Sequence, residues 1–103
     1  MLEFKDTYEF EWDSGNDLKN WSKHSLTQKE IEEAFIGFKL IFPDEKHSQK
    51  EPRFGLIGKA ANVKLIFVAY TLRQVKVRVI SARSANLLER HIYEKASKKY
   101  SKI

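Results

Sequence analysis

The first clear pattern along the chain is an alternation of aromatic and acidic residues. Tyr8–Asp13 reads Tyr-Glu-Phe-Glu-Trp-Asp. Successive side chains of a strand point to opposite faces, so three rings would share one face and three carboxylates the other. Asp13 or Ser14 is suited to cap a helix that runs to His24, because their side-chain oxygens accept hydrogen bonds from the first turn. The pattern predicts a half-buried strand followed by a helix.

A capping-box pattern indicates a second helix. Thr27 and Glu30 have the spacing at which each side chain bonds the other residue's backbone N–H. The helix is expected to end at Gly37, since glycine readily adopts the left-handed conformation that closes helices. Its inward face would consist of Ile31, Ala34 and Phe35.

The middle of the chain reads as three strands. Phe38–Phe42 is short and apolar and ends at Pro43. A polar loop over Asp44–Pro52 separates it from a hairpin of Arg53–Lys59 and Val63–Tyr70. The second strand of this hairpin is apolar on both faces, which is typical of a central strand covered on both sides.

The last third of the chain carries one more strand and a helix. A tight connection at Leu72–Gln74 leads into a strand over Val75–Ser81. A turn over Ser81–Ser84 would place Arg83 at the joint with a helix from about Ser84 to Lys98. This helix is expected to bury a stripe of apolar residues at helical spacing, namely Leu88, Ile92 and Ala96.

In order, the elements are β-α-α-β-β-β-β-α. This order predicts an α+β fold, in which two N-terminal helices and one C-terminal helix pack on an antiparallel sheet. The 103 residues suit one domain over residues 1–103 with a single modest core. The ends, residues 1–7 and 99–103, are expected to be loosely ordered.

Composition narrows the class of protein. The chain is 42% hydrophobic and 32% charged, as globular proteins are, and it has no cysteine for disulfides or thiolate metal sites. The longest apolar run, around Leu65–Tyr70, is too short to cross a bilayer, and no signal-peptide pattern is seen. We expect a cytoplasmic protein with no membrane partner.

Charge is distributed unevenly along the chain. Met1–Pro52 has seven Lys/Arg against twelve Asp/Glu, whereas Arg73–Ile103 has nine against two. A basic C-terminal third suggests a polyanionic partner, either nucleic acid or an acidic protein. A lysine-rich solvated helix would explain the lysines alone. It explains the arginines poorly, because arginine is suited to bidentate contacts with phosphate or carboxylate.

The arginines are the main candidates for chemistry. Antiparallel neighbouring strands could place Arg53 and Arg78 on one exposed sheet face. Clustered guanidiniums stabilise the extra charge of a pentacoordinate phosphorane, and preorganised electrostatic stabilisation usually contributes more to catalysis than any other single effect. The competing interpretation is structural, because a charge within a sheet needs a partner. Glu9, Glu11 or Glu89 could supply that partner to Arg78.

Proton transfer has several candidate groups, and no metal-ligand spacing such as His-x-x-x-His is present. RNA cleavage needs no metal, because the 2′-hydroxyl can attack the adjacent phosphate once a base removes its proton. His24, His47 or Glu51 could be that base, and Lys23, His24 or an arginine could assist the leaving oxygen. A lone histidine is more often structural or exposed than catalytic. Tyr93 could contact phosphate or stack on a base, although a helix tyrosine is more often at the core edge.

Other nucleic-acid and nucleotide proteins fit less well. The chain has no glycine-rich phosphate loop, nucleophile elbow or dinucleotide fingerprint. A helix-turn-helix over Asn16–Phe35 would carry three glutamates that repel a DNA backbone. A plain RNA-binding domain would use exposed aromatic stacking pairs, which the pattern does not indicate.

The residues taken together resemble the BrnT toxins of bacterial type II toxin–antitoxin modules, over most of the chain from about Tyr8 to Tyr93. No single piece is distinctive, but the ordered set is. The pieces are Phe10-Glu-Trp-Asp13, Asn20-x-x-Lys23-His24, Glu33-Ala34, Phe42-Pro-Asp44 with His47, Glu51-x-Arg53, Ile57-Gly58, Tyr70-Thr71, Arg78-Val-Ile-Ser-Ala-Arg83 and Glu89-Arg90-x-x-Tyr93.

The resemblance implies a RelE-like fold and an endoribonuclease that arrests translation by cutting RNA without a metal or other cofactor. It implies as partners the RNA substrate and a BrnA-type antitoxin that binds operator DNA, with the toxin as co-repressor, in an assembly of two toxins on an antitoxin dimer. With the chemistry above, the expected catalytic residues are His24, Glu51, Arg53, Arg78 and Arg83. The expected RNA-binding residues are Lys23, Arg73, Arg90 and Tyr93.

The chain departs from the family pattern at three positions. Asn16, Ser25 and Ser84 stand where the family usually has a lysine, a glycine and a basic residue. The alternative interpretation is a non-catalytic binding module, a degenerate toxin that acts only through its antitoxin–DNA complex. The two interpretations differ over Arg78 and Arg83. Alanine there would unfold the protein if they are structural and would leave a folded, inactive chain if they are catalytic.

Overall fold

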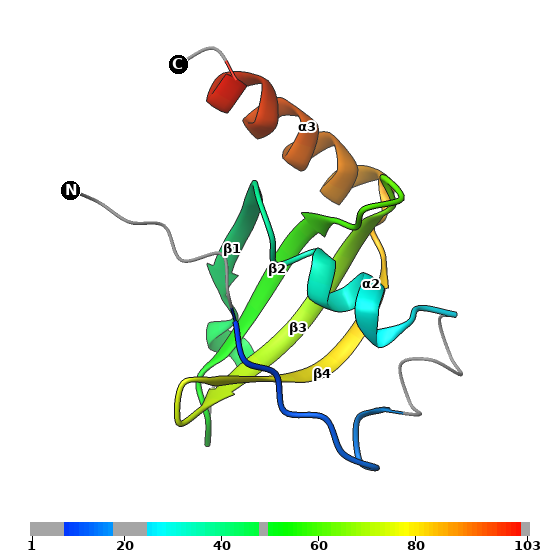
Figure 1. The fold of residues 1–103 in the computed structure, drawn as a ribbon. Coiled ribbons are helices and arrows are strands. Elements are labelled where there is room, and N and C mark those ends of the chain that lie inside the picture. Colours follow the sequence, from blue (N-terminus) through cyan, green and yellow to red (C-terminus); the bar gives the residue numbers. More distant parts are fainter. Residues whose placement is uncertain (1–7, 18–24, 48–49, 102–103) are drawn as a thin grey trace, which may run out of the picture.

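The computed structural model describes residues 8–17, 25–47 and 50–101 and shows an α+β fold (Figure 1). Four strands form one antiparallel sheet in chain order, so each strand pairs with the next. The four consecutive strands predicted from the apolar segments are thereby confirmed. They are β1 (Lys39–Pro43), β2 (Arg53–Lys59), β3 (Leu65–Arg73) and β4 (Lys76–Ser84), with a short 3₁₀ helix η1 (Glu45–His47) in the loop after β1.

Helix α2 (Gln28–Glu33) has the predicted cap. The Thr27 hydroxyl oxygen accepts a hydrogen bond from the Glu30 N–H at 3.0 Å, and the Glu30 carboxylate accepts one from the Thr27 N–H at 3.0 Å. The predicted helix end at Gly37 is wrong, because α2 ends at Glu33 with Ala34 as its C-cap. Gly37 lies beyond the helix, and its φ of 76° is in the left-handed region predicted for it. The predicted inward residues Ile31, Ala34 and Phe35 are all buried.

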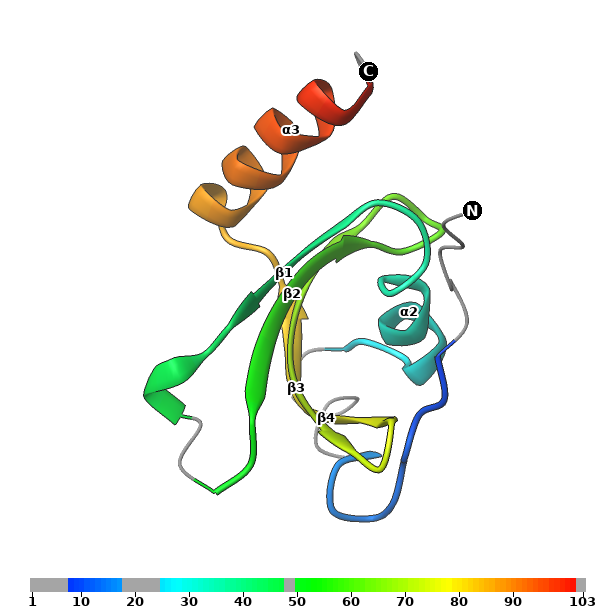
Figure 2. The ribbon, with the colours of Figure 1, turned by 90° about the vertical axis from the view of Figure 1, so that its left-hand side faces the viewer.

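Helix α2 and the extended segment before it cover one face of the sheet, which we call the closed face (Figure 2). Alternate residues of β2, β3 and β4 meet the helix there and form the main core. The approach is close enough that a Cβ atom at Gly58 would lie 2.0 Å from the Ala34 carbonyl oxygen. Glycine at this position therefore sets the distance between α2 and the sheet. Core residues from the strands include Leu56, Ile66, Val68, Val77 and Val79.

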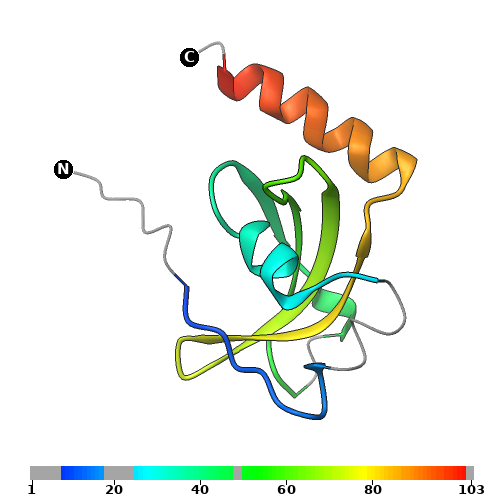
Figure 3. The ribbon, with the colours of Figure 1, turned by 45° about the vertical axis from the view of Figure 1, so that its right-hand side comes forward.

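The expected strand over Tyr8–Asp13 is not a regular strand, and this prediction is wrong. Phe10 forms a single parallel bridge with Val77 of β4. The Glu11 N–H donates to the Val77 carbonyl, and the Val77 N–H donates to the Glu9 carbonyl, each at 2.8 Å. Figure 3 shows the reason: the segment crosses β4 instead of running along it, so only one residue pair comes into register.

The predicted alternation in this segment is nevertheless correct. The Tyr8, Phe10 and Trp12 rings contact one another in sequence and pack against the core of the closed face. The helix expected to run to His24 lies outside the described residues. At its expected start, the Asp13 carbonyl accepts hydrogen bonds from the backbone N–H groups of Asn16 and Asp17.

Helix α3 (Leu87–Ser101) leaves the sheet at one end rather than packing along it (Figures 1 and 3). The predicted buried stripe is wrong, because Leu88 is 67% exposed and Ile92 is 44% exposed. The residue that does bury is Tyr93, whose ring packs edge-on against Phe38 with 5.4 Å between centroids. Helical spacing identified an apolar face, but no other element covers it within the described structure. None of the described helices has the length and apolar character to cross a membrane.

Strand β4 is longer than predicted at its C-terminal end. The tight turn before it lies at Gln74 and Val75, which have φ of 50° and 66°, so β3 continues through Arg73. Two central residues with positive φ match the right-handed twist of a hairpin, which is why the strands can pair up to the turn. At the other end β4 continues through Ser84, so Arg83 belongs to the strand and not to a turn.

A register shift interrupts the pairing of β3 with β4. Ala69 pairs with Ser81 and Tyr70 with Val79, so Ile80 is an extra residue on β4. Arg78 and Arg83 are five positions apart, which in a regular strand would put them on opposite faces. The extra residue brings both onto the face opposite α2, which we call the open face.

Candidate functional site

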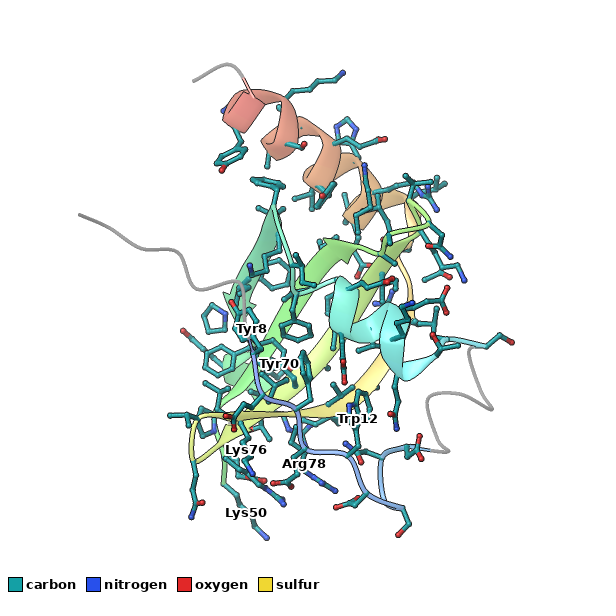
Figure 4. The ribbon with its side chains drawn as sticks, in the orientation of Figure 1. Tyr8, Trp12, Lys50, Tyr70, Lys76 and Arg78 are labelled. Carbon is teal, nitrogen blue, oxygen red and sulfur yellow. The ribbon has the colours of Figure 1, made fainter. Side chains whose placement is uncertain are left out.

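The strand register brings two predicted site residues into one row of the open face. Arg53 on β2 pairs with Thr71 on β3, and Thr71 pairs with Arg78 on β4. The expectation that Arg53 and Arg78 share a sheet face is confirmed. Adjacent strands are separated by about 4.8 Å, so the two backbones lie roughly 10 Å apart, with Thr71 between them. This row is at the end of the sheet away from α3, where Figure 4 also places Lys50 and Lys76.

Arg78 has two carboxylate partners from the N-terminal segment. One guanidinium nitrogen donates to Glu11 at 3.0 Å and to Asp13 at 2.7 Å, and the other donates to Asp13 at 3.1 Å. The side chain is only 17% exposed. The hydrogen bonds to Asp13 raise the pKa of Arg78 above its usual value and lower the pKa of Asp13. The structural interpretation of Arg78 named Glu11 correctly and did not include Asp13.

Arg73 and Glu51 form a second ion pair beside this row. The Arg73 Nε atom donates to Glu51 at 3.0 Å, and Arg73 also lies 3.5 Å from Glu11. The hydrogen bonds from Arg73, with smaller contributions from nearby Arg53 and Arg78, lower the pKa of Glu51. A carboxylate with a lowered pKa is a weaker base, which bears on its expected role in proton transfer.

Arg83 is held by three groups at the junction of β4 and α3. Its guanidinium donates to both oxygens of Glu89, at 2.8 and 2.9 Å, and to the Ser84 carbonyl at 3.3 Å. It also lies over the Phe67 ring, 4.5 Å from the centroid. The bonds to Glu89 raise the pKa of Arg83, and the same contact lowers the pKa of Glu89. Arg83 is therefore fixed in place on the open face.

Glu89 has a second role, which was not predicted from the sequence. Its carboxylate accepts a hydrogen bond from the Asn86 N–H at 2.9 Å, and the Asn86 side chain accepts one from the Glu89 N–H at 2.8 Å. This reciprocal pair caps α3 in the manner of a capping box. Asn86 and Glu89 have the required spacing, so the signal was present in the sequence. One carboxylate thus fixes both Arg83 and the start of α3.

Asn16 is a further residue whose role was not foreseen. It is buried, and its side-chain amide donates to the carbonyls of Glu11 and Val79, each at 3.1 Å. Its side-chain oxygen accepts a hydrogen bond from the Asp13 N–H at 2.8 Å. Asn16 therefore ties the acidic segment to β4. At Ser25, where the resemblance led us to expect glycine, φ is 54°, a conformation that glycine adopts without strain.

Two further predicted site residues, Arg90 and Tyr93, lie on α3 and not in the arginine row. Lys23 and His24 lie outside the described residues. Arg90 lies on the exposed side of α3, and Tyr93 is 5% exposed with its hydroxyl donating to the Phe38 carbonyl at 3.3 Å. The Tyr93 ring is thus covered by the protein itself. In the described part of the chain, no three His, Asp or Glu side chains are grouped so as to hold a metal ion.

The arrangement can orient an anion on the open face. The guanidiniums of Arg73, Arg78 and Arg83 are held by carboxylates, which fixes their donors before any ligand binds. Comparison with protein families matches residues 12–89 to the family described as ribonuclease toxin, BrnT, of type II toxin–antitoxin system. The matched span begins at Trp12 and ends at Glu89. No curated protein matches the chain.

Proposed function

The chain belongs to the BrnT family of ribonuclease toxins of type II toxin–antitoxin systems, and on that premise we propose that it cuts RNA without a metal ion. Cleavage would proceed by attack of the RNA 2′-hydroxyl on the adjacent phosphate. We place the scissile phosphate on the open face, in contact with Arg53, Arg78 and Arg83.

The observation that carries this proposal is the strand register. It puts Arg53, Arg78 and Arg83 on the one face of the sheet that α2 does not cover. Each guanidinium has five N–H donors, and the hydrogen bonds of Arg78 and Arg83 to carboxylates leave others directed elsewhere. Donors that are already positioned cost little reorganisation when charge develops on the phosphate.

Proton transfer would fall to His24 and Glu51. The lowered pKa of Glu51 makes it the weaker base near neutral pH, so we assign removal of the 2′-hydroxyl proton to His24. Glu51 would instead hold Arg73 in place through their 3.0 Å ion pair. Lys23 and Arg73 would contact neighbouring phosphates, because a cation needs only proximity for that role.

A toxin of this family has an antitoxin protein as partner. We propose that the antitoxin is of the BrnA type, that it binds operator DNA with the toxin as co-repressor, and that two toxins assemble on an antitoxin dimer. The proposal includes a RelE-like arrangement, supported by the four-stranded antiparallel sheet. Mass measurement of the co-purified complex, with and without operator DNA, tests the antitoxin partner, the stoichiometry and the binding of DNA.

A second candidate function is a non-catalytic binding module. The observation in its favour is that Arg78 and Arg83 already have carboxylate partners inside the protein. Removing one partner of a partly buried ion pair is destabilising, because the other charge is left uncompensated. A structural role for these arginines would therefore be visible as loss of folding in alanine variants.

RNA cleavage by the purified protein in EDTA tests the proposal. We expect cleavage by the unmodified chain and a rate roughly 10²–10³-fold lower for Arg83→Ala, the usual effect of removing one preorganised donor at a transition state. Lys39→Ala is the matched control. It removes one positive charge whose ammonium lies over Tyr8, on the closed face, so its rate should stay near that of the unmodified chain.

Circular dichroism and urea unfolding separate the two candidates. A folded but inactive Arg83→Ala protein supports the ribonuclease. An unfolded Arg83→Ala protein supports the binding module. Cleavage that requires added magnesium contradicts the metal-independent mechanism, and absence of cleavage even with ribosomes contradicts the ribonuclease proposal as a whole.

A further inference from the structure

The open face carries two aromatic rings beside the arginines. Phe42 on β1 pairs with Gly55 on β2, and Phe67 lies on β3, with 6.3 Å between the ring centroids and 31° between their planes. Phe42 is 37% exposed, near the end of the edge strand β1. An exposed ring on a sheet face is available for stacking.

Glycine under Phe42 determines how this ring lies. A Cβ atom at Gly55 would be 2.8 Å from the Phe42 ring and 3.1 Å from the Phe67 ring. A Cβ atom 2.8 Å from the Phe42 ring would force that ring to move, so the absent side chain allows Phe42 to lie against the sheet. Its opposite side then faces outward.

A small cavity opens beside these rings. Its volume is about 200 Å³, and it is lined by Phe42, Pro43, Asp44, Phe54, Gly55, Phe67 and Ala69. Pockets for drug-sized ligands are typically about 300–1,000 Å³. The cavity therefore suits a single planar ring system rather than a larger ligand, and most of its lining is apolar or aromatic.

Two arginines share the open face with this cavity, although neither lines it. Arg53 precedes Gly55 by two positions on β2 and so points to the same face, and Arg83 pairs with Phe67 and lies over its ring. A largely apolar slot with two arginines on the same sheet face matches a nucleotide, in which a flat base adjoins phosphates. An apolar side chain of a protein partner would fill the slot but would have no use for these positive charges.

We infer that the Phe42 slot is a nucleobase subsite, in which one base of single-stranded RNA stacks on Phe42 while its flanking phosphates contact Arg53 and Arg83. Stacking is indifferent to base identity because every base has a π face. This inference rests on the proposed function, since RNA is taken as the ligand, and it deepens that function by assigning a place to a base next to the reacting phosphate.

Binding of a non-cleavable RNA tests the subsite separately from cleavage. The probe is a short fluorescent RNA with 2′-O-methyl groups, titrated with the full chain. We expect Phe42→Ala to weaken binding about tenfold, within the range measured for loss of one base–aromatic stack, and Phe42→Trp to bind as the unmodified chain does. Ile41→Ala is the matched control, because Ile41 is the next residue, is similarly exposed and pairs with Leu56 of the closed face.

An abasic series identifies the group that occupies the slot. Removing single bases from the probe should weaken binding to the unmodified chain about tenfold at one position. The same removal should have no further effect on Phe42→Ala, because the two changes delete one contact. Gly55→Ala should act like Phe42→Ala, since its Cβ displaces the Phe42 ring while the arginines stay in place.

Two results overturn the subsite: equal RNA affinity of Phe42→Ala and the unmodified chain, or equal loss with abasic RNA in both proteins. Either would show that no RNA base stacks on Phe42. Base-dependent binding without cleavage of ordinary RNA supports the subsite and contradicts the ribonuclease. Cleavage of ordinary RNA, together with RNA binding that does not depend on Phe42, supports the ribonuclease and contradicts the subsite.

Discussion

The two faces of the sheet are built from alternate residues of the same strands, yet they are stabilised in different ways. The closed face meets α2 through apolar side chains that are almost entirely buried, with Gly58 in contact with the helix backbone. The open face carries ion-paired arginines and partly exposed rings. Burial of apolar surface fixes the first face. The second face is fixed by a smaller buried cluster of Ile57, Leu65 and Tyr93 near α3 and by hydrogen-bonded charge pairs elsewhere.

The difference separates stability from function within one layer of the molecule. A change on the closed face must be accommodated by a packed core, where even one added atom is felt. A change on the open face meets side chains that solvent or a ligand can replace. Substitutions on the two faces of one strand therefore test separately what each face contributes to stability and to function.

The largest difference is expected between two glycines of β2. Gly58→Ala would place a Cβ 2.0 Å from a backbone oxygen of α2, so the helix must shift and the core must open, at a cost of about 3 kcal/mol. Gly55→Ala meets only side-chain rings, which can turn away, and should cost less than about 1 kcal/mol. Urea unfolding measures both values. Equal losses would mean that the open face is packed as tightly as the closed one.

An intermediate effect is expected from the acidic partners of Arg78. Asp13→Asn combined with Glu11→Gln removes two carboxylates that compete with phosphate for this guanidinium. RNA binding should become roughly fivefold tighter, and its salt dependence steeper, because contact-distance charge repulsion is removed. Glu94→Gln, on exposed α3, is the control for a change in net charge. Weaker binding in the double variant would show that fixing the Arg78 donors contributes more to RNA affinity than is gained by removing the repulsion from these carboxylates.

The smallest effect concerns acid stability of the closed face. Glu30 accepts hydrogen bonds from the Thr27 N–H and from Asn62, and it pairs with Lys64, which together lower its pKa to about 2. Since this folded-state pKa lies below the ordinary value of 4.5, the stabilisation is complete above pH 4.5 and is lost as the pH falls toward 2.

Thermal unfolding between these two pH values should show the loss directly. A capping interaction contributes on the order of 1 kcal/mol, which corresponds to about 5 °C in a domain of this size. Glu30→Gln should have a lower melting temperature at pH 7 and a flatter dependence below pH 4.5. RNA binding at neutral pH should not change, because Glu30 belongs to α2, which covers the closed face, whereas the proposed RNA site lies on the open face. If the melting temperature of Glu30→Gln falls equally steeply with decreasing pH, the acid-induced loss of stability is due to other carboxylates.

Local signals in the sequence were sufficient for much of this fold. The capping box of Thr27 and Glu30, the left-handed Gly37 and the apolar strands depend on neighbours within a few residues, and all were predicted correctly. Alternation also predicted that Arg53 and Arg78 share a face. The sharing required only antiparallel pairing of successive strands, which is the simplest topology for short connections.

The failures concern contacts between distant elements. The spacing of Leu88 and Ile92 shows that α3 has an apolar face, but spacing carries no information on whether another element covers it. The bond between Arg83 and Glu89 joins two elements whose boundary was misplaced. Phe42 and Phe67 come together only through the register of three strands, which is why a stacking surface was not expected.

The extra residue at Ile80 has a consequence for recognising such a face in other chains. A β4 strand without Ile80, with three residues between its arginines and regular pleating, would retain every pairing seen here on either side of that position. The same face can therefore be encoded with two different separations of the same two arginines. A search by fixed residue spacing would find one of these encodings and miss the other, so pairing partners, and not intervals along the chain, are the signature to look for.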